Sequence, residues 1–208
     1  HVNCVNITPD QKYLCAVDLG VDQVKIYKFN YETGKITLVD MLRCEQESAP
    51  RIIKFSPDGR FAYLICELKN YISVYSYKDG PRGPVFELVQ TISTLNDYHS
   101  KGSAACVLRF SRDWNYVLCS NAGDNSIGIF KVDHETGMLE KICILPISGD
   151  YPKAADFFPD NRHIMSLNHE TNTMTIFKIN YEKKYFSMWG KPLKVETPNC
   201  ILVSEIQG

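Results

Sequence analysis

Four ionisable residues stand at matching places along this chain: Arg51, Glu67, Lys153 and His169. An arginine is the natural two-point partner of a carboxylate or phosphate, and a lysine can serve as a phosphate ligand. Glu67 is a candidate general base for activating water. The structural alternative is that Arg51 and Glu67 only form an ion pair between neighbouring strands.

These residues belong to an internal repeat, which is marked by a turn that contains an aspartate. The turn aspartates recur at spacings of 48, 55 and 47 residues: Asp10, Asp58, Asp113 and Asp160. An apolar strand follows each aspartate, and twelve residues after it stands a second turn former: Asp22, Asn70, Asn125 and Asn172. A third strand with alternating apolar residues comes next, and three of the units show a fourth strand.

Short alternating strands between Gly, Asn, Asp and Pro turns are typical of antiparallel hairpins. Four strands in about fifty residues match the size of a propeller blade. The sequence therefore predicts an all-β fold, a β-propeller with blades starting near residues 1, 49, 104 and 151. An all-β sandwich would share the strand lengths but not this register of turn residues. Residues 198–203 repeat only the first strand of a unit and predict a closing strand, so 1–208 reads as one propeller domain, the C-terminal part of a longer chain.

The hairpin geometry also predicts which residues gather at one rim, because antiparallel strands pair residues that are distant from the turn. Seven residues before each turn aspartate stand Asn3, Arg51, Cys106 and Lys153. Nine residues after it stand Leu19, Glu67, Ala122 and His169. Both sets are expected at the end opposite the turn, where propellers concentrate function. Alternation places His1 on the same strand face as Asn3.

Composition argues against several functional classes. The 23 basic and 24 acidic residues are interspersed and give a net charge of −1, so no basic block indicates a nucleic-acid partner. The apolar runs are too short for a membrane span. The eight cysteines form no CxxC pair, which argues against a zinc site. Several lie in apolar strands, so we expect free thiols in a reducing cytoplasm, with no metal and no cofactor.

The chain resembles the seven-bladed lactonase family, which contains propeller-type bacterial 6-phosphogluconolactonases and fungal carboxy-muconate cyclases. The matching segments are residues 18–24, 49–51, 56–63, 67–68, 121, 125–127, 135–137 and 198–203. The resemblance implies a seven-bladed ring with its active site at one mouth of the central channel. It also implies that this chain supplies the last four blades and the closing strand.

Roles for particular residues follow from the same resemblance. It places Arg51 and Glu67 at the family's active-site positions, and we expect His1 to join them in the catalytic set. Lys153, His169, Asn3 and Asn121 are expected to bind substrate, and His169 is included because its register matches that of Glu67. Asn3 stands where the family has a histidine, and Ala122 and Lys153 stand where it has arginines.

The resemblance implies metal-independent hydrolysis of a small anionic sugar lactone, with 6-phosphogluconolactone as the family default. Two other functions stay open: a muconate-type cycloisomerase, and a non-catalytic propeller that binds a protein or a small anion. The sequence does not indicate an oligomeric state.

Overall fold

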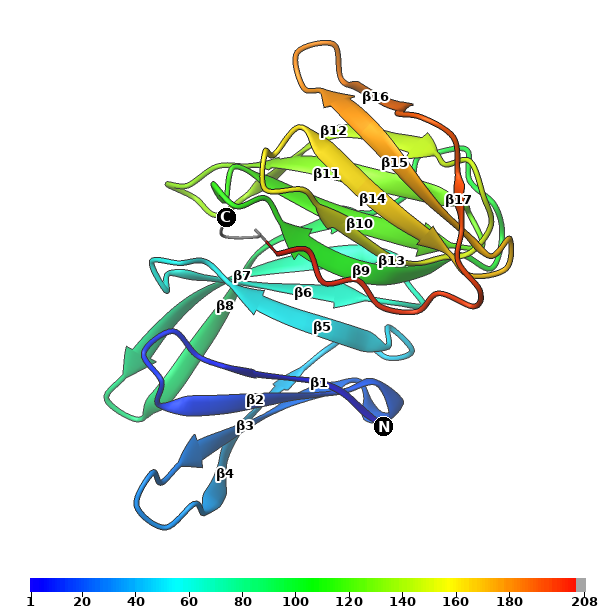
Figure 1. Cartoon of the computed structure of the whole chain (residues 1–208). Helices are drawn as coiled ribbons and strands as arrows, with labels where there is room; N and C mark the ends of the chain where they lie inside the picture. The colour runs from blue at the N-terminus through cyan, green and yellow to red at the C-terminus, as the bar shows by residue number, and fades with distance from the viewer. Residues whose placement is uncertain (205–208) are drawn as a thin grey trace. The chain divides into compact units, whose positions relative to one another are not determined.

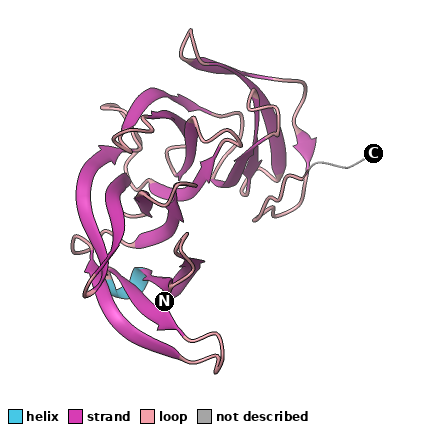
Figure 2. Cartoon of the chain, turned by 90° about the vertical axis from the view of Figure 1, so that its left-hand side faces the viewer, coloured by secondary structure: helices cyan, strands magenta, loops and turns pink. Residues whose placement is uncertain are grey.

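The computed structural model describes residues 1–204, which form antiparallel sheets joined by tight turns (Figures 1 and 2). The first sheet contains β1 (Val2–Ile7), β2 (Tyr13–Asp18), β3 (Gln23–Phe29) and β4 (Ile36–Arg43). The second contains β5 (Pro50–Phe55), β6 (Phe61–Cys66), β7 (Tyr71–Gly80) and β8 (Gly83–Ser93). The third contains β9 (Ala104–Phe110), β10 (Tyr116–Ala122), β11 (Ser126–Val132) and β12 (Leu139–Pro146). The fourth contains β13 (Pro152–Phe157), β14 (His163–Asn168), β15 (Thr173–Asn180) and β16 (Tyr185–Met188), and β17 (Leu193–Lys194) also pairs with β15.

These sheets confirm the predicted all-β fold of four-stranded antiparallel blades, and we call them blades 1 to 4 in chain order. Within each blade the strands pair in the order in which they occur along the chain. The fourth blade has an outer strand, β16, that the sequence pattern did not make evident. The one helix among residues 1–204 is a 3-10 turn at Leu19–Val21. No helix in this part of the chain is long and apolar enough to cross a membrane.

The aspartate turns between the first two strands share one hydrogen-bond pattern. In three blades a hydroxyl donates to the turn carboxylate at 2.6 Å, in the pairs Thr8–Asp10, Ser56–Asp58 and Ser111–Asp113. The residue after each aspartate has a positive φ: Gln11, Gly59, Trp114 and Asn161. Blade 4 has Phe158 in place of the hydroxyl, and its Asp160 instead contacts His163 Nδ1 at 2.6 Å.

The second turn formers of the repeat all adopt the left-handed conformation, which aspartate and asparagine tolerate best among non-glycine residues. Their φ angles are 53° for Asp22, 52° for Asn70, 54° for Asn125 and 53° for Asn172. The structure therefore confirms the turn assignment at these four positions.

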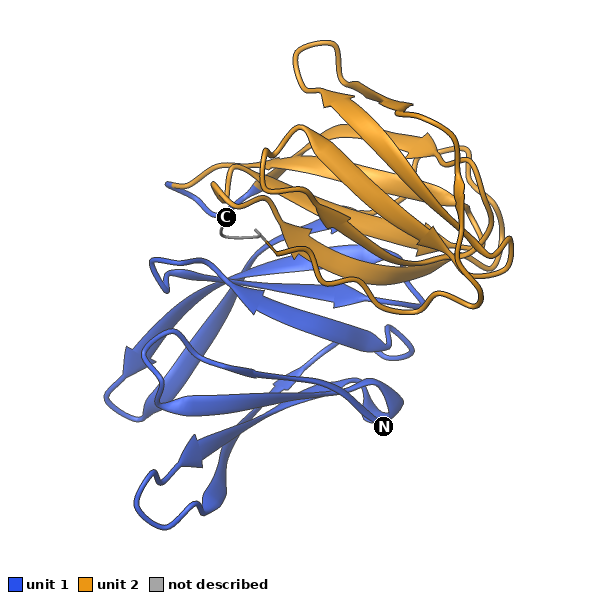
Figure 3. Cartoon of the chain, in the orientation of Figure 1, with its two compact units in different colours: residues 1–92, 135–138 blue, residues 93–134, 139–208 orange. Residues whose placement is uncertain are grey.

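The chain divides into two compact units, each with two blades (Figure 3). Unit 1 consists of residues 1–92 and 135–138, and unit 2 of residues 93–134 and 139–208. In unit 1 an apolar core between the two blades includes Val17, Ile26, Ile53 and Leu64. In unit 2 the core that joins blades 3 and 4 includes Leu118, Ile129, Ala155 and Ile164. Each unit is described by itself below.

Residues 198–203, for which the sequence predicts a closing strand, lie against blade 4 without a pairing strand, so the closing strand stays a prediction. No strand pairs with them in the described chain, so their backbone forms no sheet ladder. Side-chain contacts hold the segment to blade 4 instead: Ile201 is buried against Ala154 and Leu167. The apolar pattern of the segment thus serves packing, while a strand also needs a neighbouring backbone to pair with.

Candidate functional site

Each of the four blades has a β-bulge at the same place on its innermost strand. In blade 2, Pro50 pairs with Cys66 and Ile52 pairs with Ile65, so Arg51 is the extra residue. The bulged residues of all four blades are Asn3, Arg51, Cys106 and Lys153. These are the four residues that stand seven positions before the turn aspartates, and the sequence predicts them at the rim. A bulge redirects a side chain and commonly lies next to an active site.

Two of the left-handed turn formers, Asp22 and Asn125, hold the backbone just before the bulge of the following blade. The Asp22 carboxylate accepts hydrogen bonds from the backbone N–H groups of Glu47 and Ala49, both at 2.8 Å. Asn125 Oδ1 accepts one from the N–H of Tyr151 at 2.8 Å. Ala49 and Tyr151 each stand two residues before a bulge, so the end of one blade positions the bulge of the next.

Arg51 and Glu67 meet in unit 1. The guanidinium Nη1 of Arg51 donates a hydrogen bond to Glu67 Oε2, and the two form an ion pair. Their side chains are 29% and 21% exposed, so water reaches both groups. Glu67 follows the end of β6, and its backbone N–H donates to the carbonyl of Ala49 at 2.8 Å. The structure thus brings together the two residues expected to do the chemistry.

His1 and Asn3 lie on blade 1 of the same unit, and both are exposed. The His1 side chain is 96% exposed; the backbone nitrogen of His1 lies 2.8 Å from Asp18 Oδ1, and its carbonyl accepts a hydrogen bond from the N–H of Leu19 at 3.0 Å. Lys25 Nζ donates to the other carboxylate oxygen of Asp18 at 2.9 Å. Neither His1 nor Asn3 has a described contact with Arg51 or Glu67.

Lys153 and His169 occupy the corresponding places in blade 4 of unit 2. The Lys153 ammonium lies 5.8 Å from the ring centroid of Tyr151. His169 Nδ1 lies 3.2 Å from the carbonyl oxygen of Pro198. Both side chains are partly buried, so the rim of blade 4 presents two basic residues where blade 2 presents an arginine and a glutamate.

Asn121, predicted to bind substrate, is fully buried inside blade 3. Its Nδ2 donates to the carbonyl of Thr94 at 2.8 Å and to Ser126 Oγ at 3.0 Å. These contacts make its side chain part of the interior packing of the blade. Its register explains the burial, because it lies one residue before the rim position and alternation turns it inward.

A set of buried polar residues repeats at that inward position, eight residues after each turn aspartate: Asp18, Cys66, Asn121 and Asn168. Of this set only Asn121 is among the predicted site residues, although the repeat contains the signal for all four residues. In blade 2 the member is Cys66, directly before Glu67, and it interacts with the Cys44 thiol. The interaction with Cys44 lowers the pKa of Cys66. The interaction with Cys66, together with burial, raises the pKa of Cys44. All eight cysteines are free thiols.

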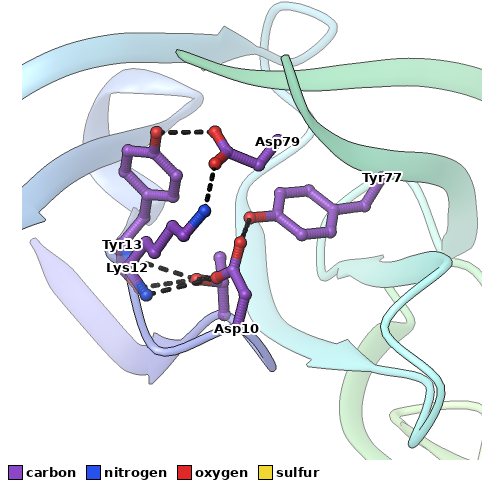
Figure 4. A network of polar contacts seen from close by, with 6 residues as sticks. Asp10, Lys12, Tyr13, Tyr77 and Asp79 are labelled. Carbon is purple, nitrogen blue, oxygen red and sulfur yellow. Dashed lines mark hydrogen bonds and ion pairs between the residues drawn. The ribbon is translucent and has the colours of Figure 1, made fainter. Parts of the chain in front are cut away.

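The opposite end of unit 1 carries a polar network that joins the turn of blade 1 to β7 (Figure 4). Tyr13 and Lys12 donate to the two oxygens of Asp79 at 2.8 and 2.5 Å, and Tyr77 donates to Asp10 Oδ2 at 3.0 Å. Burial and the Asp79 hydrogen bond raise the pKa of Tyr13 to about 12. The polar groups of this network bond to each other across blades 1 and 2. We therefore assign the network a structural role, in which it holds the two blades together.

Comparison with known proteins assigns the family. Residues 1–203 match the family model described as "Lactonase, 7-bladed beta-propeller". The chain belongs to the seven-bladed β-propeller lactonase family. The lactonase family model thus spans both units and all four bulges.

Individual relatives agree with this assignment. The chain is 36% identical to an uncharacterized protein of Lactococcus lactis subsp. cremoris over 203 residues, 97% of this chain and 58% of that protein. It is 26% identical to a 6-phosphogluconolactonase of Bacillus subtilis, over 97% of this chain and 56% of the relative. Among solved structures, a periplasmic gluconolactonase of Pseudomonas aeruginosa is 26% identical with a TM-score of 0.87, covering 96% of this chain and 56% of that one. The chain thus spans somewhat more than half the length of these relatives.

Proposed function

We propose that this chain carries part of the active site of a sugar lactonase, with 6-phosphogluconolactone as the preferred substrate. The observation that carries the proposal is the Arg51–Glu67 pair, held at a bulge on the rim of blade 2. Membership in the lactonase family and the likeness to the Bacillus subtilis 6-phosphogluconolactonase support it. The proposal concerns the whole protein of which these blades form a part.

The geometry suits the hydrolysis of a cyclic ester. Glu67 takes a proton from a water molecule, whose oxygen attacks the lactone carbonyl. Arg51 stabilises the negative charge that forms on the carbonyl oxygen, since its guanidinium carries several N–H donors in a fixed fork. The ring C–O bond then breaks, and the proton passes to the leaving alkoxide, which becomes a hydroxyl of the open-chain acid. Partial burial of both groups strengthens these charge interactions compared with those in water.

The substitutions at the rim favour one alternative, a non-catalytic propeller that binds a small anion. Asn3 cannot act as a general base, and Ala122 is fully buried without a polar group to offer. Blade 2 nevertheless retains both a base and an oxyanion donor in contact, and this favours catalysis. The cysteines, all free thiols, support the proposal that the protein works in the cytoplasm.

A proton-release assay with 6-phosphogluconolactone tests the proposal. We expect the full-length protein to accelerate hydrolysis over the buffer reaction and Glu67→Gln to remove at least about 99% of that gain. Glu170→Gln, which changes an exposed glutamate of blade 4, provides the matched control and should retain turnover. If the full-length protein gives no acceleration but binds the hydrolysis product, the non-catalytic alternative replaces the lactonase proposal.

A further inference from the structure

Two thiols of unit 1 meet where blade 1 leads into blade 2. Cys44 directly follows β4, and its backbone N–H donates to the carbonyl of Asp22 at 2.9 Å. Cys66 ends β6, where it lies opposite Tyr71 of β7. Both side chains belong to the apolar core between the two blades, with Cys44 packed against the cluster that contains Cys66. The two sulfur groups interact, although they come from different blades.

The surroundings of the two sulfurs differ. Cys66 is buried, and the Tyr71 and Ser48 hydroxyls also interact with its sulfur. The Ser48 hydroxyl oxygen is buried without a regular hydrogen-bond partner among residues 1–204, so a charged Cys66 sulfur would give this donor an acceptor. Cys44, by contrast, is partly exposed.

These surroundings divide the chemistry between the two thiols. The Cys44 thiol, and then the Tyr71 and Ser48 hydroxyls, lower the pKa of Cys66 against the opposing effect of burial. Cys66 and burial raise the pKa of Cys44. Cys66 is therefore the thiol that ionises more readily, and Cys44 is the one that a reagent in water reaches.

A second cysteine pair in the same core provides a contrast. Cys4 is partly exposed and Cys15 is fully buried. The pKa of Cys15 is raised to about 12, chiefly by burial and then by Cys4. A thiol in this environment behaves as an inert apolar side chain. A shared core alone does not make two cysteines reactive.

We propose that Cys44 and Cys66 form a redox site, which a hydroperoxide oxidises to a reversible disulfide. The Cys66 thiolate takes the proton of the Cys44 thiol, and the Cys44 sulfur attacks the peroxide O–O bond. The alkoxide leaves with that proton as an alcohol, or as water from hydrogen peroxide, and Cys44 becomes a sulfenic acid. The Cys66 thiolate then displaces hydroxide from Cys44, so the two sulfurs lose two electrons and the peroxide gains them. Cytoplasmic disulfides are mostly of this transient kind.

The position of the thiols connects them to the rim of blade 2. Cys66 directly precedes Glu67, whose N–H donates to the carbonyl of Ala49 at 2.8 Å. Cys44 begins the connection that leads to Ala49, two residues before Arg51. Because a disulfide draws the sulfurs to about 2.05 Å, its formation should shift Glu67 relative to Arg51. This effect on catalysis rests on the proposed function, whereas the disulfide itself does not.

Peptide mapping of the full-length protein tests the redox site. Hydrogen peroxide is raised until the exposed Cys200 is oxidised, and the remaining thiols are blocked with iodoacetamide. Trypsin then releases Cys44 within residues 44–51 and Cys66 within residues 61–69. We expect these two peptides to be linked by a disulfide, and the link to disappear with dithiothreitol. Oxidised Cys200 without the linked peptides overturns the proposal.

Variants separate a paired site from indiscriminate oxidation. In Cys66→Ala, which removes the base for the Cys44 proton, we expect Cys44 to oxidise at least about tenfold more slowly. Cys4→Ala is the matched control, since it changes a partly exposed cysteine of the same core, and it should form the linked peptides at the parent rate. Melting temperatures verify that the variants fold. Equal oxidation of Cys44 in the parent and in folded Cys66→Ala, or linked peptides that appear only in urea, contradicts the site.

Turnover of 6-phosphogluconolactone measures the consequence for the rim. After removal of the peroxide, the oxidised protein should be at least about tenfold slower, because small displacements of catalytic groups are costly. Dithiothreitol should restore the rate, and Cys44→Ala should keep its rate through the same treatment. An unchanged rate with the disulfide fully formed overturns the coupling to the rim. If the reduced protein hydrolyses no lactone, the proposed function fails, and the linked peptides still decide the redox site.

Discussion

Blades 2 and 4 use one backbone design to present opposite charge balances. Both have a bulged basic residue, Arg51 or Lys153, and a rim residue that hydrogen-bonds the backbone two positions before the bulge. In blade 2 the rim residue is Glu67, which pairs with the bulged arginine. In blade 4 it is His169, so both of these rim positions carry basic residues. Blade 2 therefore pairs opposite charges at its rim, whereas blade 4 does not.

This difference shows how a propeller diversifies its rim without altering its sheets. The bulge and the left-handed turn former are backbone features that blades 2 and 4 share, while the side chains at the rim differ. A propeller can thus vary a few positions per blade on a rigid frame.

The largest expected difference between the two blades is kinetic. Arg51→Gln should lower kcat for lactone hydrolysis about 100-fold or more, because it removes a donor to the developing oxyanion. Lys153→Gln should mainly raise KM, by about tenfold, because the anion contact is made in the ground state and the transition state alike. Initial rates over a range of lactone concentrations separate the two parameters. A loss of kcat in both variants would mean that the blades do not divide the work in this way.

A smaller difference is expected in folding stability. Arg51 and Glu67 are partly exposed, so a double-mutant cycle with Arg51→Gln and Glu67→Gln should give a coupling of about 1 kcal/mol or less. The same cycle with Lys153→Gln and His169→Gln should give no favourable coupling, since both groups are basic. Urea unfolding of the seven chains, the parent and three variants for each blade, measures both values. A stabilising coupling in blade 4 would reveal an internal partner for these residues and contradict the charge contrast.

The smallest expected effect concerns the turns, where blades 2 and 4 should behave alike. Burial opposes ionisation of Asp58, but the Ser56 hydroxyl and the backbone and guanidinium N–H groups of Arg60 hold its pKa at about 2. The pKa of Asp160 is also lowered: burial opposes this, and His163 with the backbone N–H groups of Arg162 and His163 overcomes it. A carboxylate with a lowered folded-state pKa stabilises the fold above its unfolded pKa of about 3.9, and this is lost as the pH falls.

For Asp58 that window runs from about pH 4 to about pH 2. Asp58→Asn should therefore reduce stability at pH 7 and flatten its decline over this window, and Asp160→Asn should act in the same direction. The effect should be modest because the Asp58 side chain is 45% exposed. Urea midpoints measured between pH 7 and pH 2 provide the test. An unchanged acid slope in both variants would remove these turns from the acid response.

Much of the fold could be predicted because its turns use residue types that favour particular backbone conformations. The aspartate turns predicted the hairpins, and Asp22, Asn70, Asn125 and Asn172 predicted left-handed turns that the structure confirms. The register of those turns also predicted that Arg51 and Glu67 lie close together. The sequence fell short where tertiary contacts decide. Asn121 reads as a polar residue near the rim, yet packing buries it. The closing strand at residues 198–203 stays a prediction, because none of the strands among residues 1–204 pairs with it.

The sequence by itself determined the blades, their turns and the identity of the rim residues, since these depend on local backbone preference and strand periodicity. Only the tertiary structure decided that each innermost strand carries a bulge. A bulge is an extra residue on one strand relative to the strand that it pairs with, so the sequence of one strand alone does not show it. The structure also decided that the Arg51 charge has a carboxylate beside it while that of Lys153 has none among residues 1–204. Pairing of charges depends on side-chain directions in space, and that geometry assigns the two basic residues different chemistry.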